Sequence, residues 1–320
     1  MMENNFDNFS FGINFHYFHD KHHLQGNDSL SNDSFTKIVK LIERQKILNP
    51  EDFIKNLKKK NSVNSVCFTF DDGLRSQLDI ALSVLEKFNI NSFLFVPTIF
   101  LKGDADLMIL SRFFKIIYFK NDDDFFELFY KVLNTNTSKF LEENSSYIEY
   151  QKKKYPFYSL SELKFRLIRN KYLSIEEVKE IFKEMFLIKK FDYIKYSKKI
   201  FLNSKDIKKI YNSGHKIGLH SHSHPPSIGR LSFTKQYEEY SLNKEILISI
   251  LKCNPNEINS MSHPLGSYND DTFRVLKKLN IDIGFKETTD IDMNVKKINN
   301  SMFEIAREDC YVFQKKNQLI

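Results

Sequence analysis

The chain has 320 residues, with 48 Lys and Arg against 41 Asp and Glu, which leaves a formal net charge of +7. Hydrophobic residues make up 41% of the sequence, and Gly and Pro are scarce at 9 and 7, so the composition predicts a buried core and excludes collagen-like or wholly disordered chains. A pI of about 9.0 would suit a nucleic-acid-binding protein, but no nucleic-acid motif accompanies it, so nucleic acid is not an expected partner.

Cysteine usage and the N-terminus narrow the cellular setting. Cys67, Cys253 and Cys310 are far apart and odd in number, which argues against a disulfide framework or a thiolate zinc site. The first residues include acidic side chains and no long apolar run, so they do not resemble a secretory signal peptide. No stretch reaches the roughly 18 apolar residues of a membrane span. We therefore expect a cytoplasmic protein that is at most peripheral to a membrane.

Short apolar segments alternate with helical periodicity along the chain, which predicts a parallel sheet or barrel. The expected strands cover residues 11–17, 65–70, 92–97, 216–220, 259–263, 281–285 and 303–306. The expected helices between them cover residues 76–88, 233–251 and 270–279. About seven strands favour a barrel-like arrangement over a small open sheet.

The span 104–204 interrupts this alternation. It contains four segments of helical periodicity and no good strand; the segments are 107–119, 123–133, 161–170 and 174–186. We interpret it as a helical insertion, and an insertion at the C-terminal ends of barrel strands would cover or shape a functional site.

A basic run from Lys189 to Lys209 contains eight lysines against two aspartates. It could attract an anionic substrate group such as a diphosphate. The alternative is a solvated helix face whose lysines reflect an AT-rich genome, and the pattern does not decide between them.

The first chemical motif is Thr69-Phe70-Asp71-Asp72-Gly73, at the end of an apolar strand. Neighbours on a strand point to opposite faces, but a turn at the strand end can bring both carboxylates to one cavity. Two acids beside a buried strand would be costly if they were buried without partners. The alternative is a polar helix N-cap, which Asp-Asp-Gly also suits.

The second motif is His220-Ser221-His222-Ser223-His224-Pro225. Positions i and i+4 share a face in both a helix and a strand, so His220 and His224 could meet one divalent metal. Two His and one carboxylate with an open position form a common catalytic metal site. The alternative is an exposed histidine cluster without a role.

The third motif is Ser262-His263-Pro264-Leu265-Gly266-Ser267-Tyr268-Asn269, a short strand that runs into a rigid turn. His263 would then lie at a strand end, level with the first two motifs. An ordinary strand-to-helix turn is the alternative.

Together these motifs resemble the polysaccharide deacetylase family, the NodB-homology carbohydrate esterases. The first motif matches residue for residue, the second has the form H-[ST]-x-x-H, and the third is similar to the family's Pro- and Gly-containing turn. The order along the chain agrees, and the resemblance covers about 1–100 and 200–310. It implies a distorted (β/α)7 barrel, which would make residues 1–320 one domain that contains the insertion 104–204.

The resemblance also implies a metal-dependent N-deacetylase. It assigns Asp71 as the general base and Asp72, His220 and His224 as metal ligands. The divalent ion would be Zn²⁺, with Co²⁺, Ni²⁺ or Mn²⁺ as alternatives, and would polarise the amide carbonyl and acidify a water. The backbone N–H after Pro264, that of Leu265, would stabilise the oxyanion, and Tyr268 would contribute to substrate binding.

Two departures from the family pattern matter. The late histidine that serves the family as general acid is missing, so His263 could be the general acid here. Alternatively, His16 on the N-terminal strand could contact the substrate and serve as the general acid. The fourth motif has no close match, and residues 305–309 are a substitute in which Arg307 could hold Asp71 ionised. The alternatives are local packing for His16 and a surface ion pair for Arg307.

We therefore expect a hydrolase that removes the N-acetyl group from an N-acetylated sugar, as a polysaccharide or surface-glycan precursor. A lipid-linked precursor would bring peripheral membrane contact. Two alternatives stay open. One is a metal-dependent or metal-free hydrolase of another acyl or cyclic amide bond, and the other is a catalytically degenerate carbohydrate-binding barrel. The sequence does not predict the oligomeric state.

Overall fold

A seven-stranded parallel sheet forms the centre of the molecule in a computed structural model that describes residues 10–26, 29–59, 63–155, 158–286, 299 and 301–320. The strand order is β6-β5-β4-β3-β2-β1-β7. The strands are β1 (Phe11–Phe15), β2 (Val66–Phe70), β3 (Phe93–Val96), β4 (Lys216–Leu219), β5 (Ser260–Ser262), β6 (Ile283–Phe285) and β7 (Arg307–Asp309). All neighbouring strands pair in parallel, so all carboxyl ends lie at one end of the sheet.

The sheet curls into a nearly closed barrel. Its two edge strands, β6 and β7, are joined by the segment that precedes β7, because Ile305 pairs with Phe285 and the Gly12 N–H donates to Ala306 O at 2.9 Å. The expected last strand at 303–306 is therefore displaced: the ladder with β1 begins at Arg307, and Ile305 makes only a single bridge. The expectation of a distorted (β/α)7 barrel is confirmed.

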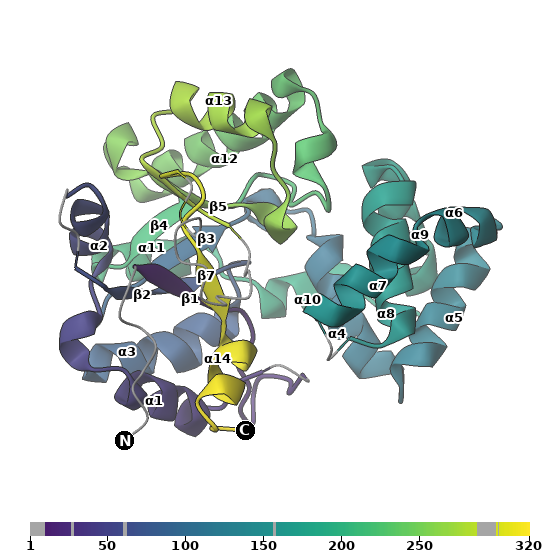
Figure 1. Cartoon of the computed structure of the whole chain (residues 1–320), viewed down its shortest axis with the longest axis horizontal. Helices are drawn as coiled ribbons and strands as arrows, with labels where there is room; N and C mark the ends of the chain where they lie inside the picture. Colours follow the sequence, from purple (N-terminus) through teal and green to yellow (C-terminus); the bar gives the residue numbers. More distant parts are fainter. Residues whose placement is uncertain (1–9, 27–28, 60–62, 156–157, 287–298, 300) are drawn as a thin grey trace.

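Seven helices surround the strands (Figure 1). They are α1 (Asn32–Leu41), α2 (Pro50–Leu57), α3 (Ser83–Lys87), α11 (Ser204–Asn212), α12 (Phe233–Leu251), α13 (Asp270–Lys278) and α14 (Cys310–Lys316). The helix expected at 76–88 begins as a π-helical turn, Gln77–Leu82, before α3. None of the helices in the described part of the chain is long and apolar enough to cross a membrane.

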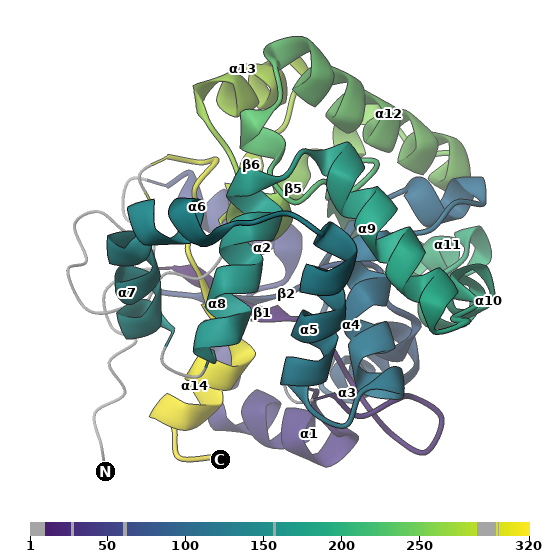
Figure 2. The ribbon, with the colours of Figure 1, turned by 90° about the vertical axis from the view of Figure 1, so that its right-hand side faces the viewer.

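Between β3 and α11 the chain forms a group of helices on one side of the barrel (Figures 1 and 2). They are α4 (Leu107–Tyr118), α5 (Asp122–Leu133), α6 (Ser138–Glu143), α7 (Ser145–Lys154), α8 (Leu160–Leu167), α9 (Ile175–Ile188) and α10 (Tyr193–Ile200). A π-helical turn, Ile168–Tyr172, follows α8 directly, and a Ser174–Glu177 capping box starts α9. We call residues 104–204 the helical span below.

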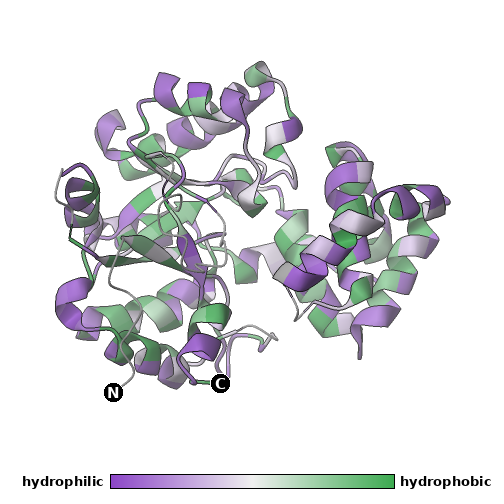
Figure 3. Ribbon diagram, viewed as in Figure 1, coloured by the Kyte–Doolittle hydropathy of each residue, from purple (hydrophilic) through white to green (hydrophobic). Residues whose placement is uncertain are grey.

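Alternation along the strands divides the packing between the inside and the outside of the barrel. Cys67, Phe93, Phe95 and Phe285 belong to one buried cluster, whereas their strand neighbours Phe68 and Leu94 pack with the surrounding helices. Figure 3 shows the resulting contrast between hydrophobic strands and the largely hydrophilic outer helices α12 and α13. The abundant phenylalanines thus fill the barrel core, with ring centroids such as Phe93–Phe285 5.1 Å apart.

The helical span has a second hydrophobic core of its own, which reaches the barrel beside the first motif, among other places. Phe114 on α4 is fully buried among aromatic rings of α5 and α9. The ring of Phe201 stacks on that of Phe100, with centroids 4.4 Å apart, and Phe201 forms a β-bridge with Leu74. Phe201 and Leu74 belong to this core, and Phe100 packs against it. Leu74 follows Gly73 directly, so the helical span packs beside the first motif.

Candidate metal and catalytic site

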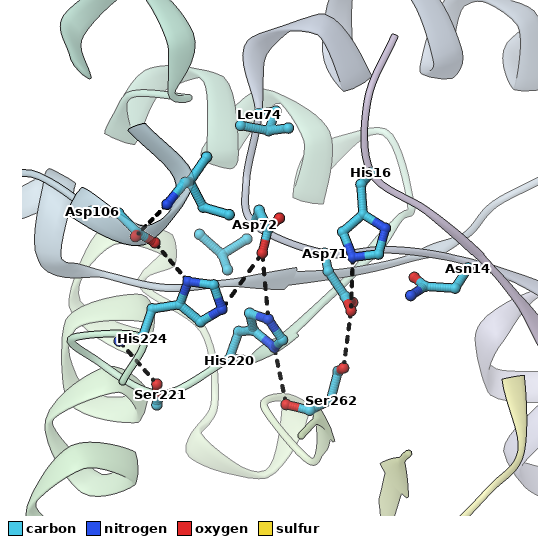
Figure 4. Close-up of polar contacts among 12 residues, drawn as sticks. Asn14, His16, Asp71, Asp72, Leu74, Asp106, His220, Ser221, His224 and Ser262 are labelled. Atoms are coloured by element: carbon cyan, nitrogen blue, oxygen red, sulfur yellow. Dashed lines mark hydrogen bonds and ion pairs between the residues drawn. The ribbon is translucent and has the colours of Figure 1, made fainter. Parts of the chain in front are cut away.

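The three motifs meet at the carboxyl ends of the strands. Asp71 and Asp72 follow β2, His220 follows β4, and His263 follows β5. The parallel sheet carries all these chain ends to the same edge, which is why residues almost 200 positions apart become neighbours. All four residues are at most 2% exposed. Figure 4 shows Asp72 facing His220 and His224, and Asp71 facing His16 and Ser262.

Asp72, His220 and His224 form a group with metal-ligand geometry. One donor atom from each lies within 4.8 Å of the others, and all three residues are buried. The Nε2 atoms of His220 and His224 lie 3.5 and 3.7 Å from Asp72 Oδ1 (Figure 4). Burial opposes the charged carboxylate, but the histidines outweigh it and hold the pKa of Asp72 well below its usual range.

The opposite ring nitrogens of the two histidines are held by the protein. His220 Nδ1 lies 3.0 Å from Ser262 O, and His224 Nδ1 lies 2.7 Å from Asp106 Oδ2. Burial alone would lower the pKa of His224, but Asp106 and Asp72 outweigh it and raise that pKa. Anchoring the Nδ1 atoms directs both Nε2 atoms inward, as in carboxylate–histidine–metal arrangements.

Asp106 is a site residue that sequence reasoning missed. It is 1% exposed, lies at the start of the helical span, and caps α4 through Oδ1, which accepts from the Ile109 N–H at 3.0 Å. In the sequence it reads only as a helix N-cap, and no spacing rule links it to His224, 118 positions later. The capping signal was visible, but the contact was not.

Backbone conformation explains why adjacent residues can face one cavity. Asp72 has φ of 75° and Gly73 has φ of 63°, so the chain turns sharply after Asp71. A Cβ on Gly73 would approach Phe100 Cζ to 3.0 Å, so this position needs glycine for space as well as for φ. Ser221 and His224 also have positive φ, at 59° and 52°. Strained non-glycine residues concentrate at functional sites.

Asp71 has different partners from its neighbour. Its Oδ1 accepts from Arg307 Nη1 at 2.8 Å, and its Oδ2 accepts from Ser262 Oγ at 3.2 Å. His16 Nε2 lies 3.8 Å from Oδ2 (Figure 4). Burial would raise the pKa of Asp71, but Arg307 and His220 outweigh burial and lower it. Asp71 is therefore a buried carboxylate that stays ionised at neutral pH.

The third motif contributes its residues unequally. His263 is buried, and its Nε2 lies 2.8 Å from Phe303 O, so Nε2 carries the proton and Nδ1 has no partner in the described structure. Burial lowers the pKa of His263 to about 4. Tyr268 stacks on His263 at 4.4 Å and donates to Glu304 at 3.1 Å.

A cavity of about 80 Å³ lies between these groups. It is lined by His16, Asp71, Asp72, His220, His224, His263, Leu265 and Arg307, and by Tyr17, Arg112, Tyr158 and Arg166 among others. Pro264 and Tyr268 are not among the described residues that line it. Leu265 reaches it from a turn with φ of 51°. Of the residues expected to contact the substrate, Leu265 and His16 therefore line the cavity, whereas Pro264 and Tyr268 do not.

Other histidines and the lysine run lie elsewhere. His222 Nδ1 lies 2.9 Å from Thr98 Oγ1, and His19 Nδ1 lies 2.8 Å from Ser29 Oγ, so neither joins the metal-ligand group. All eight lysines from Lys189 to Lys209 are exposed. None of them lines the 80 Å³ cavity.

The donor set fits a divalent metal ion. Two imidazole nitrogens and one carboxylate oxygen converge, the second nitrogen of each ring is already engaged, and the cavity beside them leaves room for further ligands. Such two-His, one-carboxylate sets with open positions suit catalytic zinc and related ions.

Comparisons with known proteins agree with this site and fold. The polysaccharide deacetylase family model matches residues 172–284, which include His220, His224 and His263. No curated protein matches the chain at a significant level.

Solved structures show the same fold over almost the whole chain. The deacetylase PplD of Streptococcus pyogenes, in complex with acetate, has a TM-score of 0.53 at 15% identity and covers 93% of this chain and 90% of its own. IcaB from Ammonifex degensii has a TM-score of 0.55 at 12% identity, with 97% and 95% covered. BC0361, a polysaccharide deacetylase from Bacillus cereus, has a TM-score of 0.52 at 13% identity, with 95% and 65% covered.

Residues 172–284 match the polysaccharide deacetylase family, and the barrel has the fold of solved deacetylase structures. The NodB-homology resemblance of the sequence is confirmed.

Proposed function

We propose that the protein is a divalent-metal-dependent hydrolase that removes the N-acetyl group from an N-acetylated sugar of a polysaccharide or surface-glycan precursor. The observation that carries the proposal is the pairing of two different carboxylate environments. Asp72 faces the Nε2 atoms of two anchored histidines, and Asp71, the next residue, faces Arg307 and the open cavity. One environment suits metal binding and the other suits proton transfer.

Asp72, His220 and His224 would hold the metal. A divalent ion bound there would polarise the acetyl carbonyl and lower the pKa of a water toward ~7, and Zn²⁺ is our first choice, with Co²⁺, Ni²⁺ or Mn²⁺ as alternatives. The contribution of the protein is orientation, because Ser262 O and Asp106 Oδ2 hold the Nδ1 side of each ring.

Asp71 would act as the general base. Its Oδ2, the oxygen that Arg307 does not hold, faces His16 and accepts the proton of the water that attacks the acetyl carbon. Arg307 keeps the carboxylate ionised and fixes its orientation. General-base catalysis of this kind contributes about 10²–10⁴-fold to the rate.

His16 is our candidate for returning a proton to the leaving nitrogen. Its side chain is 26% exposed and lines the cavity 3.8 Å from Asp71. His263 is the weaker candidate, because its Nε2 proton is directed at Phe303 O and its low pKa keeps the ring neutral. His263 would instead support the turn on which Pro264 and Leu265 lie, with Tyr268 stacked on it.

The backbone N–H of Leu265 is our candidate for stabilising the oxyanion of the tetrahedral intermediate. Leu265 lines the same cavity as Asp71, and one such donor is worth about 10²–10³ in rate. Because Asp106 of the helical span holds a ligand of the barrel, we also propose that residues 1–320 act as one domain in which 104–204 is an insertion.

The test combines metal analysis with acetate release from N-acetylglucosamine oligosaccharides. We expect about one divalent ion per chain and loss of acetate release after chelation, with recovery on adding Zn²⁺ or Co²⁺. Asp72→Ala should lose both metal and activity, and Asp71→Asn should keep the metal and lose at least ~10²-fold in kcat. Asp52→Asn, at a carboxylate that is 63% exposed on α2, is the control and should change neither. Stoichiometric metal without acetate release from any N-acetylated sugar would refute the proposal.

A further inference from the structure

The helical span brings a cluster of three arginines next to the candidate site. Arg112 lies on α4, Arg166 lies on α8, and Arg169 lies in the π-helical turn that follows α8. Neither the sequence motifs nor the family match accounts for these residues, because the match begins at residue 172. Their mutual proximity is visible in their electrostatics: burial and the charges of Arg166 and Arg112 lower the pKa of Arg169 to about 9.

The cluster has more positive than negative charge. Arg166 Nε donates to Glu162 Oε1 at 2.6 Å, and Lys115 competes for the same carboxylate at 3.7 Å while it pairs with Asp122 at 2.9 Å. Neither Arg112 nor Arg169 forms an ion pair with any described carboxylate. Arg112 Nη1 instead donates to the Tyr17 hydroxyl at 2.9 Å. Within the helical span the three arginines and Lys115 share Glu162 and Asp122, and Asp72 of the barrel also attracts Arg112.

Two of these arginines line two adjacent cavities. Tyr17, Arg112, Tyr158 and Arg166 line the 80 Å³ cavity that contains Asp71 and Asp72, and they also line a neighbouring cavity of about 730 Å³. The larger volume is in the range of small-molecule sites, whereas the smaller one suits a single reacting group. An anionic group in either cavity would therefore lie beside Arg112 and Arg166.

Guanidinium groups bind planar or tetrahedral oxyanions through parallel N–H donors. Partly buried arginines with few carboxylate partners are therefore placed to gain from an incoming anion, which would also relieve the repulsion among the three cations. The exposed lysines from Lys189 to Lys209 cannot serve this purpose at the candidate site, because they do not line the cavity that contains it.

We propose that Arg112 and Arg166 bind an oxyanion of the substrate, so that the protein acts on N-acetylated sugars that carry a phosphate ester or a carboxylate next to the acetylated unit. This inference rests on the proposed deacetylase function. It names an anionic substrate class and gives the helical span a role in selecting it.

The first test compares three matched substrates: a neutral disaccharide of N-acetylglucosamine, its 1-phosphate, and its counterpart with a uronic acid. We expect kcat/KM for one of the anionic substrates to exceed that of the neutral one by about tenfold, the worth of one charge-assisted contact. The preferred anionic substrate shows whether the bound oxyanion is a phosphate or a carboxylate. The preference should decrease with added NaCl.

The variants Arg112→Gln and Arg166→Gln should each bring the ratio of anionic to neutral kcat/KM close to one, mainly through KM. Arg166→Lys should retain part of the preference, because the charge remains and the bidentate geometry is lost. Arg274→Gln on α13, a surface arginine that is 68% exposed, removes the same charge elsewhere and should leave the ratio unchanged. Equal turnover of all three substrates by the wild-type protein, or a preference that survives in both glutamine variants, would overturn the inference.

A binding measurement separates this inference from the proposed function. Inorganic phosphate is titrated into chelator-treated Asp72→Asn protein, so that a metal ion cannot bind the anion. If no substrate releases acetate, the proposed function fails, and phosphate binding then decides the inference alone. Binding that weakens about tenfold on adding either glutamine substitution supports an oxyanion subsite, whereas absent or unchanged binding refutes it. Thermal unfolding shows whether each variant is folded. If Arg112→Gln does not fold, Arg166→Lys takes its place in the binding measurement.

Discussion

Asp71 and Asp72 are adjacent in sequence and nonetheless have different chemical surroundings. Asp71 shares its Oδ1 with Arg307, which is 1% exposed, whereas Asp72 faces two imidazoles. Both carboxylates have a lowered pKa, but for different reasons. Pairs of acids whose surroundings differ in this way commonly divide the work of binding and proton transfer.

Arg307→Met should expose the cost of burying Asp71 without a partner. Removing one member of a buried ion pair costs about 3–5 kcal/mol, so the free energy of unfolding at pH 7 should fall by that order. Asp71 with a lowered pKa stabilises the wild-type fold above the unfolded-state pKa, and this stability is lost as pH falls through the folded-state pKa. Urea unfolding at pH 7 and pH 4 measures both effects.

In the Arg307→Met variant, the contribution of Asp71 to stability depends on pH in the opposite direction. Without Arg307, burial raises the pKa of Asp71, so protonation at low pH should stabilise the variant and the difference from wild type should shrink toward pH 4. Arg307→Lys, which keeps a positive charge, should recover part of the stability at pH 7. A difference that is the same at both pH values would contradict the ion-pair explanation.

Asp106→Asn should weaken metal binding without unfolding α4. An asparagine Oδ1 can still accept from the Ile109 N–H and cap the helix. The carboxylate contact with His224 Nδ1 is lost, and losing such an outer contact typically costs about 10–100-fold in metal affinity. Competition with a chelating dye measures the affinity, and circular dichroism measures the helix content.

Asp104→Asn is the matched control for this prediction. Asp104 lies two residues earlier and is exposed, and its carboxylate accepts from the Ala105 N–H at 2.8 Å. The metal affinity of the Asp104→Asn variant should remain within about twofold of that of the wild-type protein. Equal affinities of the Asp106 and Asp104 variants would show that Asp106 only caps α4.

At the level of elements, β4 packs closely against its neighbours at Gly218. A Cβ on Gly218 would lie 2.6 Å from Ser260 Oγ on β5 and 2.7 Å from the Phe95 ring on β3. Gly218 therefore lets three strands approach closely just before His220. The metal ligand on β4 depends on this packing for its position.

Gly218→Ala should be destabilising by about 1–3 kcal/mol, because overpacking forces side chains and backbone to shift. We expect a weaker metal affinity as well, since the shift occurs two residues from His220. Urea unfolding and dye competition measure the two effects. Gly26→Ala is the control, because a Cβ there meets only the flexible end of Ile116 at 3.1 Å and should be tolerated.

Element positions were predictable to different degrees. The helix at 233–251 agrees with α12, and the first six expected strands overlap β1 to β6, because buried apolar runs and helical periodicity are local signals. Several short and partly polar helices were not predicted, namely α1, α2, α6, α7, α10, α11 and α14. β7 was misplaced because Arg307-Glu308-Asp309 is a charged strand whose assignment depends on pairing with β1.

The barrel and the helical span share packing at the site. Phe114 lies in the core of the helical span. Asp106 and Arg112, which precede it in sequence, lie at the candidate site, where Asp106 contacts His224 and Arg112 lines the cavity. Leu74 and Phe201 connect this core to the loop that follows β2. Loosening the helical span should therefore reach the site.

Phe114→Ala should cost about 3–5 kcal/mol of stability, as expected for a fully buried aromatic ring. Hydrogen exchange should speed up in α4 and α9 and also in the loop at residues 71–74, and metal affinity should fall with it. Ile116→Ala, at a 40% exposed position of the same helix, is the control and should do little. Faster exchange confined to the helical span would mean that the two parts are not coupled.

The sequence alone was sufficient for the fold class and for the candidate ligand residues, because strand motifs that end in Asp-Asp and in His-x-x-x-His are local patterns with a clear chemical meaning. It could not predict Asp106 or the arginine cluster, nor which ring nitrogen of each histidine faces the site. Those features depend on contacts between residues far apart in the chain, such as Asp106 with His224 and His220 with Ser262. Only closure of the barrel and packing of the helical span against it bring those groups within hydrogen-bonding distance.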